Sequence, residues 1–304
     1  MSLAVVDGVV VAYPRTVMVG RVGWPDRREA QGMPIYMDRH ELAGTTAEVV
    51  AQEHLKDLAI QDRYGVKFLT YWFDEARGTA FCLVQSPDKE TANCVHREAH
   101  GGVANTMVEV ELSAVEAFLG RMTDPEPPAP DRTAAVDPGF RAVMFTDIVG
   151  STEMTARLGD RRSVEIVRAH DALVRRALAG HGGREVKHTG DGIMASFADT
   201  TAAVACARAI LEAFAEFNRS SAEPIRVRIG LHAGEPVEDS NDLFGATVQM
   251  AARLCQAAEP DTIVASREVR ALSADDAGWV ALGETRLKGF PGPVPLFRVA
   301  ERQG

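Results

Sequence analysis

The sequence predicts an α+β protein with two domains that are joined by a proline-rich segment. In residues 33–112, strand and helix patterns follow in the order βαββαβ within about eighty residues, which is the order of a ferredoxin-like sandwich. Residues 139–304 alternate amphipathic helices with short strands, which indicates a second sheet covered by helices. Between them, Asp124-Pro-Glu-Pro-Pro-Ala-Pro130 is typical of a semi-rigid linker. We therefore place the domain boundary in residues 113–138.

The elements of the first domain are predicted from the spacing of its apolar residues. Strands are expected at residues 34–40, 66–73, 79–85 and 103–112, and helices at 45–64 and 89–100. The first helix should end at Gly65, because glycine commonly stops a helix. Residues 1–32 show no clear period and are predicted to be a poorly ordered leader. Asp7 and the lack of a basic start argue against a signal peptide there.

A short helix is expected at residues 113–122. Val115, Phe118, Leu119 and Met122 would form one apolar stripe along it. Such a stripe can dock on a neighbouring domain, pair with its copy in a dimer, or cover the sheet of the first domain. The sequence leaves these three arrangements open.

In the second domain, two stretches place a carboxylate just after a predicted strand. The strand at residues 141–145 is followed by a turn with Asp147, and the strand at 184–189 by a turn with Asp191. Carboxylates at strand ends can bind divalent cations, and the Gly-Ser-Thr turn at 150–152, which leads into a helix, exposes N–H groups that hold phosphate. The two stretches outline a phosphate and magnesium site, although an aspartate beside glycine is also an ordinary turn residue.

A third stretch adds a polar helix face to this outline. From Gly245 the sequence is compatible with a helix in which Gln249 and Arg253 lie at i and i+4 on one face. The remaining elements expected in this domain are helices at 152–158, 161–181 and 201–218, a hairpin at 184–197, and strands at 225–233, 262–265, 279–282 and 296–299.

These three motifs, in this order and spacing, resemble the class III nucleotidyl cyclases from residue 140 to about 299. The resemblance implies the α/β sandwich of that family, and an enzyme that forms a cyclic nucleotide and pyrophosphate from a nucleoside triphosphate. It implies that Asp147 and Asp191, with the backbone of Ile148, bind two Mg²⁺ or Mn²⁺ ions. It also places Ser151 and Thr152 near the triphosphate.

The resemblance assigns further roles to side chains around the nucleotide. Arg253 matches the arginine that stabilises the transition state, and Lys288 matches the lysine that holds the terminal phosphates. Gln249 stands where the family usually has the asparagine that orients the ribose. Its extra methylene shifts the amide by more than about 1 Å, which is enough to affect the rate.

The resemblance to the cyclases also indicates the substrate, through two residues that match those contacting the base. Lys187 and Asp242 match the residues that read the adenine edge, and an ammonium donor with a carboxylate acceptor suits N1 and the N6 amino group of adenine. The resemblance therefore favours ATP as substrate and 3′,5′-cyclic AMP as product. Two alternatives stay open: a cyclase with relaxed choice between ATP and GTP, and a nucleotide-binding regulatory protein whose turnover is weak or lost.

A homodimer is expected because one hairpin carries two distant roles. Lys187 and Asp191 are four residues apart across one turn, so in one chain the hairpin would contact both the adenine and the metal ions of an extended ATP. The family forms antiparallel dimers in which one chain supplies the aspartates and the other supplies the base-reading and transition-state residues. The resemblance implies a homodimer with two composite sites, and an inactive monomer.

Histidines concentrate in the first domain. His40 closes the first predicted strand, and His96 and His100 lie at i and i+4 in a predicted helix. Two imidazoles one helical turn apart can chelate Ni²⁺, Zn²⁺ or Cu²⁺, although ordinary hydrogen bonds at element ends would also explain them. The domain resembles a family of small ferredoxin-like proteins that includes nickel binders, in Met33-Pro-Ile-Tyr36, Asp38-Arg-His40 and Phe81-Cys-Leu-Val84. The resemblance implies a transition-metal site in this domain without fixing its ligands, for which the positions in the sequence indicate His40, His96 and His100.

Composition sets the remaining limits. The chain has 304 residues, a formal net charge of −10 and 46% hydrophobic residues, without an apolar run near the roughly eighteen residues of a membrane span. We therefore expect no transmembrane segment, and neither nucleic acid nor an anionic membrane as a partner, because both need a basic face. The four scattered cysteines fit a reducing cytoplasm and are interpreted as small buried side chains.

Overall fold

The computed structural model describes residues 33–125, 137, 139–235, 245–273 and 278–300, and the backbone of two N-terminal strands. These strands, β1 (Ser2–Val6) and β2 (Val9–Tyr13), pair antiparallel. Contacts group Met1–Met33 as one compact unit and Pro34–Gly304 as another. Apart from the two strands, the leader predicted for residues 1–32 lies outside the described residues.

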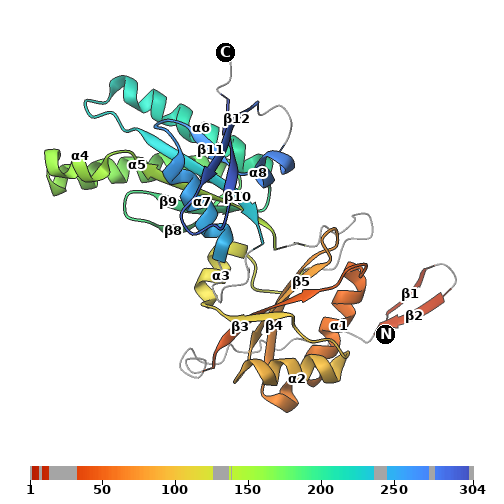
Figure 1. Cartoon of the computed structure of the whole chain (residues 1–304). Helices are drawn as coiled ribbons and strands as arrows, with labels where there is room; N and C mark the ends of the chain where they lie inside the picture. The colour runs from red at the N-terminus through yellow and green to blue at the C-terminus, as the bar shows by residue number, and fades with distance from the viewer. Residues whose placement is uncertain are drawn as a thin grey trace. The chain divides into compact units, whose positions relative to one another are not determined.

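The first domain contains a four-stranded antiparallel sheet with the strand order β4-β5-β3-β6. Helices α1 and α2 cover one of its faces (Figure 1). Its elements are β3 (Ile35–Glu41), α1 (Ala47–Ile60), the 3₁₀ helix η1 (Gln61–Tyr64), β4 (Lys67–Asp74), β5 (Thr79–Gln85), α2 (Lys89–Ala99) and β6 (Thr106–Glu109). η1 ends at Gly65, whose φ of 63° is left-handed, as predicted. This βαββαβ arrangement is the predicted ferredoxin-like sandwich.

The opposite face of this sheet is buried against the rest of the chain. Trp72 and Phe81 point from it into an apolar cluster that also contains Phe118 of helix α3 (Leu112–Leu119), and Val143 and Met194 of the second domain. All five side chains are fully buried. The stripe predicted on residues 113–122 therefore packs against both domains, in agreement with its docking on a neighbouring domain and with its covering the sheet of the first domain.

Two arginines fix the ends of the connection between the domains. Arg121 donates to Thr70 Oγ1 at 2.6 Å, and its guanidinium lies over the Trp72 ring. Arg141 donates to the carbonyl oxygen of Leu119 at 2.8 Å and pairs with Asp137 at 2.8 Å. Residues 126–130 of the predicted proline-rich linker lie outside the described residues.

The second domain is built on a seven-stranded sheet with the order β12-β13-β11-β10-β7-β9-β8. Its strands are β7 (Arg141–Ile148), β8 (Arg184–His188), β9 (Ile193–Phe197), β10 (Val227–Gly234), β11 (Ile263–Ala265), β12 (Trp279–Arg286) and β13 (Pro293–Val299). Its helices are α4 (Ser151–Leu158), α5 (Asp160–Gly180), α6 (Thr200–Ser220), α7 (Gly245–Ala257) and α8 (Arg267–Leu272). The predicted α+β fold class is confirmed, with α8 as an additional helix.

The two faces of this sheet are covered by different helices. Helices α5 and α6 pack on one face around a core that includes Phe197 and Phe214 (Figure 1). Helix α7 packs on the other face, where a side chain at Gly230 of β10 would lie 2.1 Å from the backbone nitrogen of Cys255. Glycine at this position lets the helix approach the strand closely.

Strand β7 is longer than predicted. The expected strand ended at Phe145, whereas β7 continues to Ile148, because Asp147 and Ile148 pair with Arg228 and Val227 of β10. Asp147 therefore stands inside a paired strand and not in a turn. A paired strand holds its carboxylate in a more fixed direction than a loop does.

Among the residues that the structure describes, no helix has the length and apolar character that crossing a membrane requires.

The stability of the second domain should fall in mild acid because of His232 in β10. Burial lowers the pKa of His232 to about 4, although the charge of Glu268 acts in the opposite direction. The Nδ1 atom of His232 lies 2.8 Å from Ser266 Oγ. In the unfolded chain a histidine takes up a proton near pH 6.5. As the pH falls from about 6.5 to about 4, His232 binds a proton in the unfolded state but not in the folded state. The free energy of unfolding should then decrease by up to about 3 kcal/mol.

Urea unfolding of the wild type and of His232→Gln, at neutral pH and at several pH values down to about pH 4, measures this contribution. The variant lacks the titrating group, so its free energy of unfolding should fall less steeply with acid. Parallel pH profiles for the two proteins would contradict the prediction.

Candidate functional site

Two carboxylates meet at the end of β7 and the turn between β8 and β9. Asp147 shares a face of β7 with Val143 and Phe145, since alternate residues of a strand point the same way. Asp191 lies in the β8–β9 turn, where its carbonyl oxygen accepts a hydrogen bond from the backbone N–H of Ile148 at 3.2 Å. The predicted pair of aspartates is therefore brought together.

An arginine that the motif analysis did not single out completes this group. Arg228 of β10 is the cross-strand partner of Asp147, and it donates to Asp147 Oδ2 through Nε at 2.7 Å and through its terminal nitrogen at 2.6 Å. Burial raises the pKa of Asp147, Arg228 opposes that rise, and the Asp191 carboxylate adds to it. The signal that could have identified Arg228 is the alternation of arginine with apolar residues in Ile225-Arg-Val-Arg-Ile229 of the predicted strand.

The donors around this pair suit a hard divalent cation. Asp147, Asp191 and the backbone of Ile148 offer oxygen atoms, the ligands that Mg²⁺ and Mn²⁺ prefer. Burial raises the pKa of Asp147, and repulsion from the Asp191 carboxylate adds to that rise. A bound cation would relieve this repulsion, so the residues fit the metal site that the sequence predicts.

The residues next to this pair differ in how they are held. Ser151 opens helix α4 after Gly150, which has a left-handed φ of 70°, and its hydroxyl donates to the Asp191 carboxylate. Thr152 follows in the first turn of α4 and is exposed. Helix α4 therefore begins next to the carboxylate pair, where its first N–H groups can face phosphate oxygens.

A second group forms where helix α7 meets the turn between β12 and β13. Arg253 donates through Nε to the carbonyl oxygen of Lys288 at 3.1 Å and through a terminal nitrogen to Gln256 at 2.7 Å. A side chain at Gly289 would lie 4.0 Å from Gln249 Oε1. Gln249, Arg253 and Lys288, which are separated by up to 39 residues in the sequence, thus share one location.

The remaining predicted nucleotide contacts divide into one that is described and one that is not. Lys187 of β8 is exposed, and its cross-strand partner Met194 pairs in turn with Phe145 of β7. Cross-strand partners point to the same face of a sheet, so Lys187 lies on the face that carries Asp147. Asp242 lies outside the described residues. Within the described part of one chain, no hydrogen bond or ion pair joins the carboxylate group to the Gln249, Arg253 and Lys288 group.

A buried histidine stands at the centre of the first domain's polar cluster. His96 Nε2 lies 2.9 Å from Asp38 Oδ2, and His96 Nδ1 lies 3.0 Å from Asp57 Oδ2. Burial alone would lower the pKa of His96, but the hydrogen bonds to the two carboxylates outweigh it and raise that pKa to about 10. His100, one turn further along, places Nε2 at 3.3 Å from Asp57 Oδ1.

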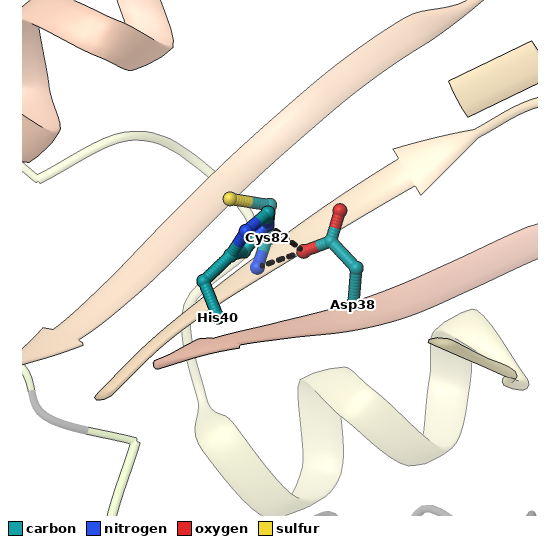
Figure 2. A group of neighbouring side chains, drawn as sticks. All are labelled: Asp38, His40 and Cys82. Carbon is teal, nitrogen blue, oxygen red and sulfur yellow. Dashed lines mark hydrogen bonds and ion pairs between the residues drawn. The ribbon is translucent and has the colours of Figure 1, made fainter. Parts of the chain in front are cut away.

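Figure 2 shows the neighbouring part of this cluster, in which Asp38, His40 and Cys82 come together from β3 and β5. Asp38 and Cys82 are cross-strand partners, and the Cys82 backbone N–H donates to Asp38 Oδ1 at 2.8 Å. His40 Nε2 lies 3.2 Å from the same carboxylate oxygen. Cys82 is buried, as the sequence predicted for the cysteines. It also belongs to a polar cluster, which the sequence did not predict.

This arrangement has the donors that a transition metal needs. Asp38, His40 and Cys82 form one set, and Asp57, His96 and His100 form another, each with its ligand atoms within 4.8 Å of one another. All of these residues except Asp38 line a cavity of about 410 Å³. Two buried atoms, His40 Nε2 and Asp57 Oδ1, lack a hydrogen-bond partner of suitable geometry despite the short distances given above. Unsatisfied buried donors and acceptors of this kind fit a bound cation.

The fold and the carboxylate pair define a nucleotidyl cyclase domain, and the family comparison agrees. The model of the adenylate and guanylate cyclase catalytic domain matches residues 140–300, so the chain belongs to that family. Residues 36–110 match the family described as nickel responsive protein SCO4226-like. The two regions correspond to the two resemblances that the motifs predicted.

Individual relatives match about half of this chain. The chain is 32% identical over 162 residues to "Putative adenylate cyclase 3" of Rhizobium meliloti, which covers 51% of this chain and 27% of the relative. It is 33% identical over 171 residues to "Uncharacterized protein Rv2212" of Mycobacterium tuberculosis, over 56% of this chain and 43% of the relative. The match therefore spans less than half the length of either relative.

Solved structures of cyclases also match about half of this chain. The adenylyl cyclase CyaB of P. aeruginosa has a TM-score of 0.46 and 23% identity, over 53% of this chain and 94% of that chain. An adenylate/guanylate cyclase/hydrolase of Silicibacter pomeroyi has a TM-score of 0.45 and 29% identity, over 54% and 97%.

Proposed function

We propose that the protein is an adenylate cyclase that converts ATP into 3′,5′-cyclic AMP and pyrophosphate in a homodimer. The observation that carries this proposal is that Asp147 and Asp191 meet at the end of β7, on a sheet face that also carries Lys187 and helix α7 with Arg253. Each chain thus supplies the cation ligands and the cationic side chains that a triphosphate requires, in two groups that a dimer can combine. Relatives named as adenylate cyclases support the choice of nucleotide.

Each group has a separate task in the proposed reaction. Divalent cations held by Asp147 and Asp191 would promote attack of the ribose 3′-oxygen on the α-phosphorus and neutralise the leaving pyrophosphate. Arg253 would stabilise the negative charge that develops on the α-phosphate oxygens. Gln249 would orient the ribose by an amide hydrogen bond.

Further side chains would bind the two ends of the nucleotide. Lys288 would contact the terminal phosphates, and Ser151 and Thr152 would hold them from the start of helix α4. Lys187 and Asp242 would read the adenine edge. Arg228, which now pairs with Asp147, would keep that carboxylate oriented and add positive charge close to the phosphates.

The dimer follows from the separation of the two groups. Arg253 and Lys288 contact each other through the β12–β13 turn, whereas Asp147 and Asp191 meet at the β8–β9 turn. A composite site would combine the carboxylate group of one chain with the Arg253 group of its partner. A two-fold dimer then contains two identical sites.

For the first domain we propose binding of a divalent transition metal, with Ni²⁺ favoured by the family match. His40, His96 and His100 would be ligands, together with carboxylate oxygens of Asp38 and Asp57. Imidazole and carboxylate ligands suit Ni²⁺ and neighbouring ions of its series.

A sensory role is supported by strand β3, which contacts both domains. Asp38 and His40 face the cluster of histidines and carboxylates, while Arg39 between them donates to Glu235 Oε2 at 3.2 Å. The carbonyl oxygen of Glu235 accepts a hydrogen bond from Thr247 Oγ1 of helix α7 at 2.7 Å. A change at the cluster therefore has a direct route to the helix that carries Arg253.

Formation of cyclic nucleotides by the purified protein tests the proposed function. ATP and GTP are each supplied with Mg²⁺ and with Mn²⁺, and the products are separated by chromatography. We expect cyclic AMP from ATP and little product from GTP. Comparable rates with both nucleotides would favour the relaxed cyclase. Binding of ATP without any cyclic product under all conditions would favour the regulatory protein.

A further inference from the structure

A chain of hydrogen bonds runs behind the two metal-binding aspartates, on the sheet face opposite to them. Thr146 of β7 precedes Asp147, and its side chain points the other way because neighbours in a strand alternate. Its hydroxyl accepts the backbone N–H of Ile193 at 3.0 Å and lies 3.3 Å from Nε2 of His170 in helix α5. Thr146 and His170 are both fully buried.

The chain continues through helix α5 to the turn that carries Asp191. His170 Nδ1 lies 3.0 Å from Asp171 Oδ1, and the other oxygen of Asp171 lies 3.0 Å from Nε2 of His188 in β8. His188 Nδ1 in turn accepts the backbone N–H of Gly190 at 3.2 Å. The chain therefore begins at the residue before Asp147 and ends at the residue before Asp191.

One set of proton positions satisfies each contact of this chain when both imidazoles are neutral, and it leaves unmade only the longer contact, at 3.5 Å, from the Thr146 hydroxyl to the carbonyl oxygen of Ile193. A carboxylate can only accept, so His170 carries its proton on Nδ1, and its Nε2 accepts the Thr146 hydroxyl. The Gly190 N–H fixes His188 Nδ1 as an acceptor, so His188 donates from Nε2 to Asp171. Burial lowers the pKa of His170, although Asp171 opposes this, which favours the neutral ring.

The backbone in front of this chain tolerates little displacement. A side chain at Gly192 would lie 1.9 Å from the carbonyl oxygen of Thr146, so β7 and the start of β9 are in direct contact there. The hydrogen bond from Ile148 to the Asp191 carbonyl lies on the same pair of segments. Movement of either segment would change the separation of the two carboxylates.

We propose that Thr146, His170, Asp171 and His188 are positioning residues that fix the relative placement of Asp147 and Asp191 for divalent cations. This inference rests on the proposed cation site of the cyclase domain. Residues behind metal ligands typically change metal affinity or activity by about 10-fold to 100-fold when they are altered. Mg²⁺ needs near-ideal octahedral geometry, so its binding should be the most sensitive.

The test compares Thr146→Val, which replaces the hydroxyl by a methyl group of similar size, with Thr146→Ser, which keeps the hydroxyl. We expect Thr146→Val to raise the Mg²⁺ concentration for half-maximal rate by about tenfold, with the KM for ATP nearly unchanged and a smaller loss in Mn²⁺. Thr146→Ser should restore most of the wild-type response. Ser163→Ala, a buried hydroxyl of helix α5 outside the chain, is the matched control and should leave the rate unchanged.

His188→Phe provides a second variant at a partly exposed position, in case Thr146→Val does not fold. It should shift the Mg²⁺ dependence in the same direction. In the double variant, the total loss of Mg²⁺-binding free energy should be smaller than the sum of the losses in the two single variants. Both substitutions break the same chain of hydrogen bonds, so the second adds little to the first. Additive losses, or Thr146→Ser behaving like Thr146→Val, would show separate packing roles and overturn the proposal.

Mn²⁺ binding without nucleotide separates this inference from the proposed function. The electron paramagnetic resonance signal of free Mn²⁺ gives the amount bound to the full chain. Thr146→Val should weaken binding in the wild-type background and have no further effect in Asp147→Asn. Weaker binding in a protein without turnover would support the positioning role and reject the cyclase. Unchanged Mn²⁺ binding and Mg²⁺ dependence would reject the positioning role, whether or not the wild type is active.

Discussion

Equal amounts of Asp147→Ala and Arg253→Ala protein, mixed and allowed to exchange subunits, should recover about a quarter of the wild-type rate of cyclic AMP formation. Each variant alone should lose at least about a hundredfold in rate, because one lacks a proposed cation ligand and the other the proposed transition-state donor. Random exchange makes half of the dimers mixed. Each mixed dimer has one site with both defects and one site with neither.

The recovery depends on the two groups coming from different chains. Lysates or purified proteins are mixed at several ratios, and the rate should be greatest at equal amounts. Two variants from the same group, Asp147→Ala and Asp191→Ala, serve as the control and should show no recovery, since every dimer then lacks a ligand at both sites. If the first pair also fails to recover while size-exclusion chromatography shows mixed dimers, the composite site is wrong.

The second large effect concerns Ni²⁺ in the first domain. Changing His96 and His100 to alanine should weaken Ni²⁺ binding by more than about a hundredfold, since the loss of two ligands exceeds the effect of altering their supporting residues. Isothermal titration with Ni²⁺ alone measures the affinity. Unaltered Ni²⁺ binding in the double variant would contradict the ligand assignment.

Two further variants separate loss of ligands from loss of structure. His96→Ala removes the imidazole that lies between the buried carboxylates of Asp38 and Asp57, which is itself destabilising. His100→Ala keeps those contacts and should still weaken binding. His54 lines the same cavity but belongs to neither ligand set, so His54→Ala should bind Ni²⁺ like the wild type. A sensory domain further predicts that Ni²⁺ changes the cyclase rate of the wild type and not that of the double variant.

The order of the elements could be predicted because it depends on local periodicity. The βαββαβ pattern and the alternating strand at residues 225–233 agree with the structure to within a few residues at their ends. The end of β7 was missed because its pairing partner, β10, is about eighty residues further along the chain. Helix α8 was missed because its six residues are too few to show a helical period in the sequence.

A site residue could be predicted only where it belongs to a recognisable sequence motif. Asp147, Asp191 and Arg253 stand in recognisable stretches. The structure places Asp191 in the predicted turn and Arg253 on the predicted helix, whereas Asp147 lies inside β7 and not in the turn that was predicted for it. Asp57 has no such stretch: it joins the histidine cluster because helices α1 and α2 pack side by side. Arg228 and Cys82 likewise acquire their partners through strand register, which depends on tertiary structure.

The apolar cluster around Trp72, Phe81 and Phe118 determines how this chain can be divided. A fragment that begins at residue 139 would expose Val143 and Met194 to water and lose the cover that α3 provides. Each large side chain uncovered in this way costs about 1.5–3 kcal/mol, a sizeable part of the stability of an ordinary domain. The smallest fragment suited to kinetic work therefore starts at Pro34. Exchange of the first domain for another ferredoxin-like module would succeed only if the new module presented the same apolar face.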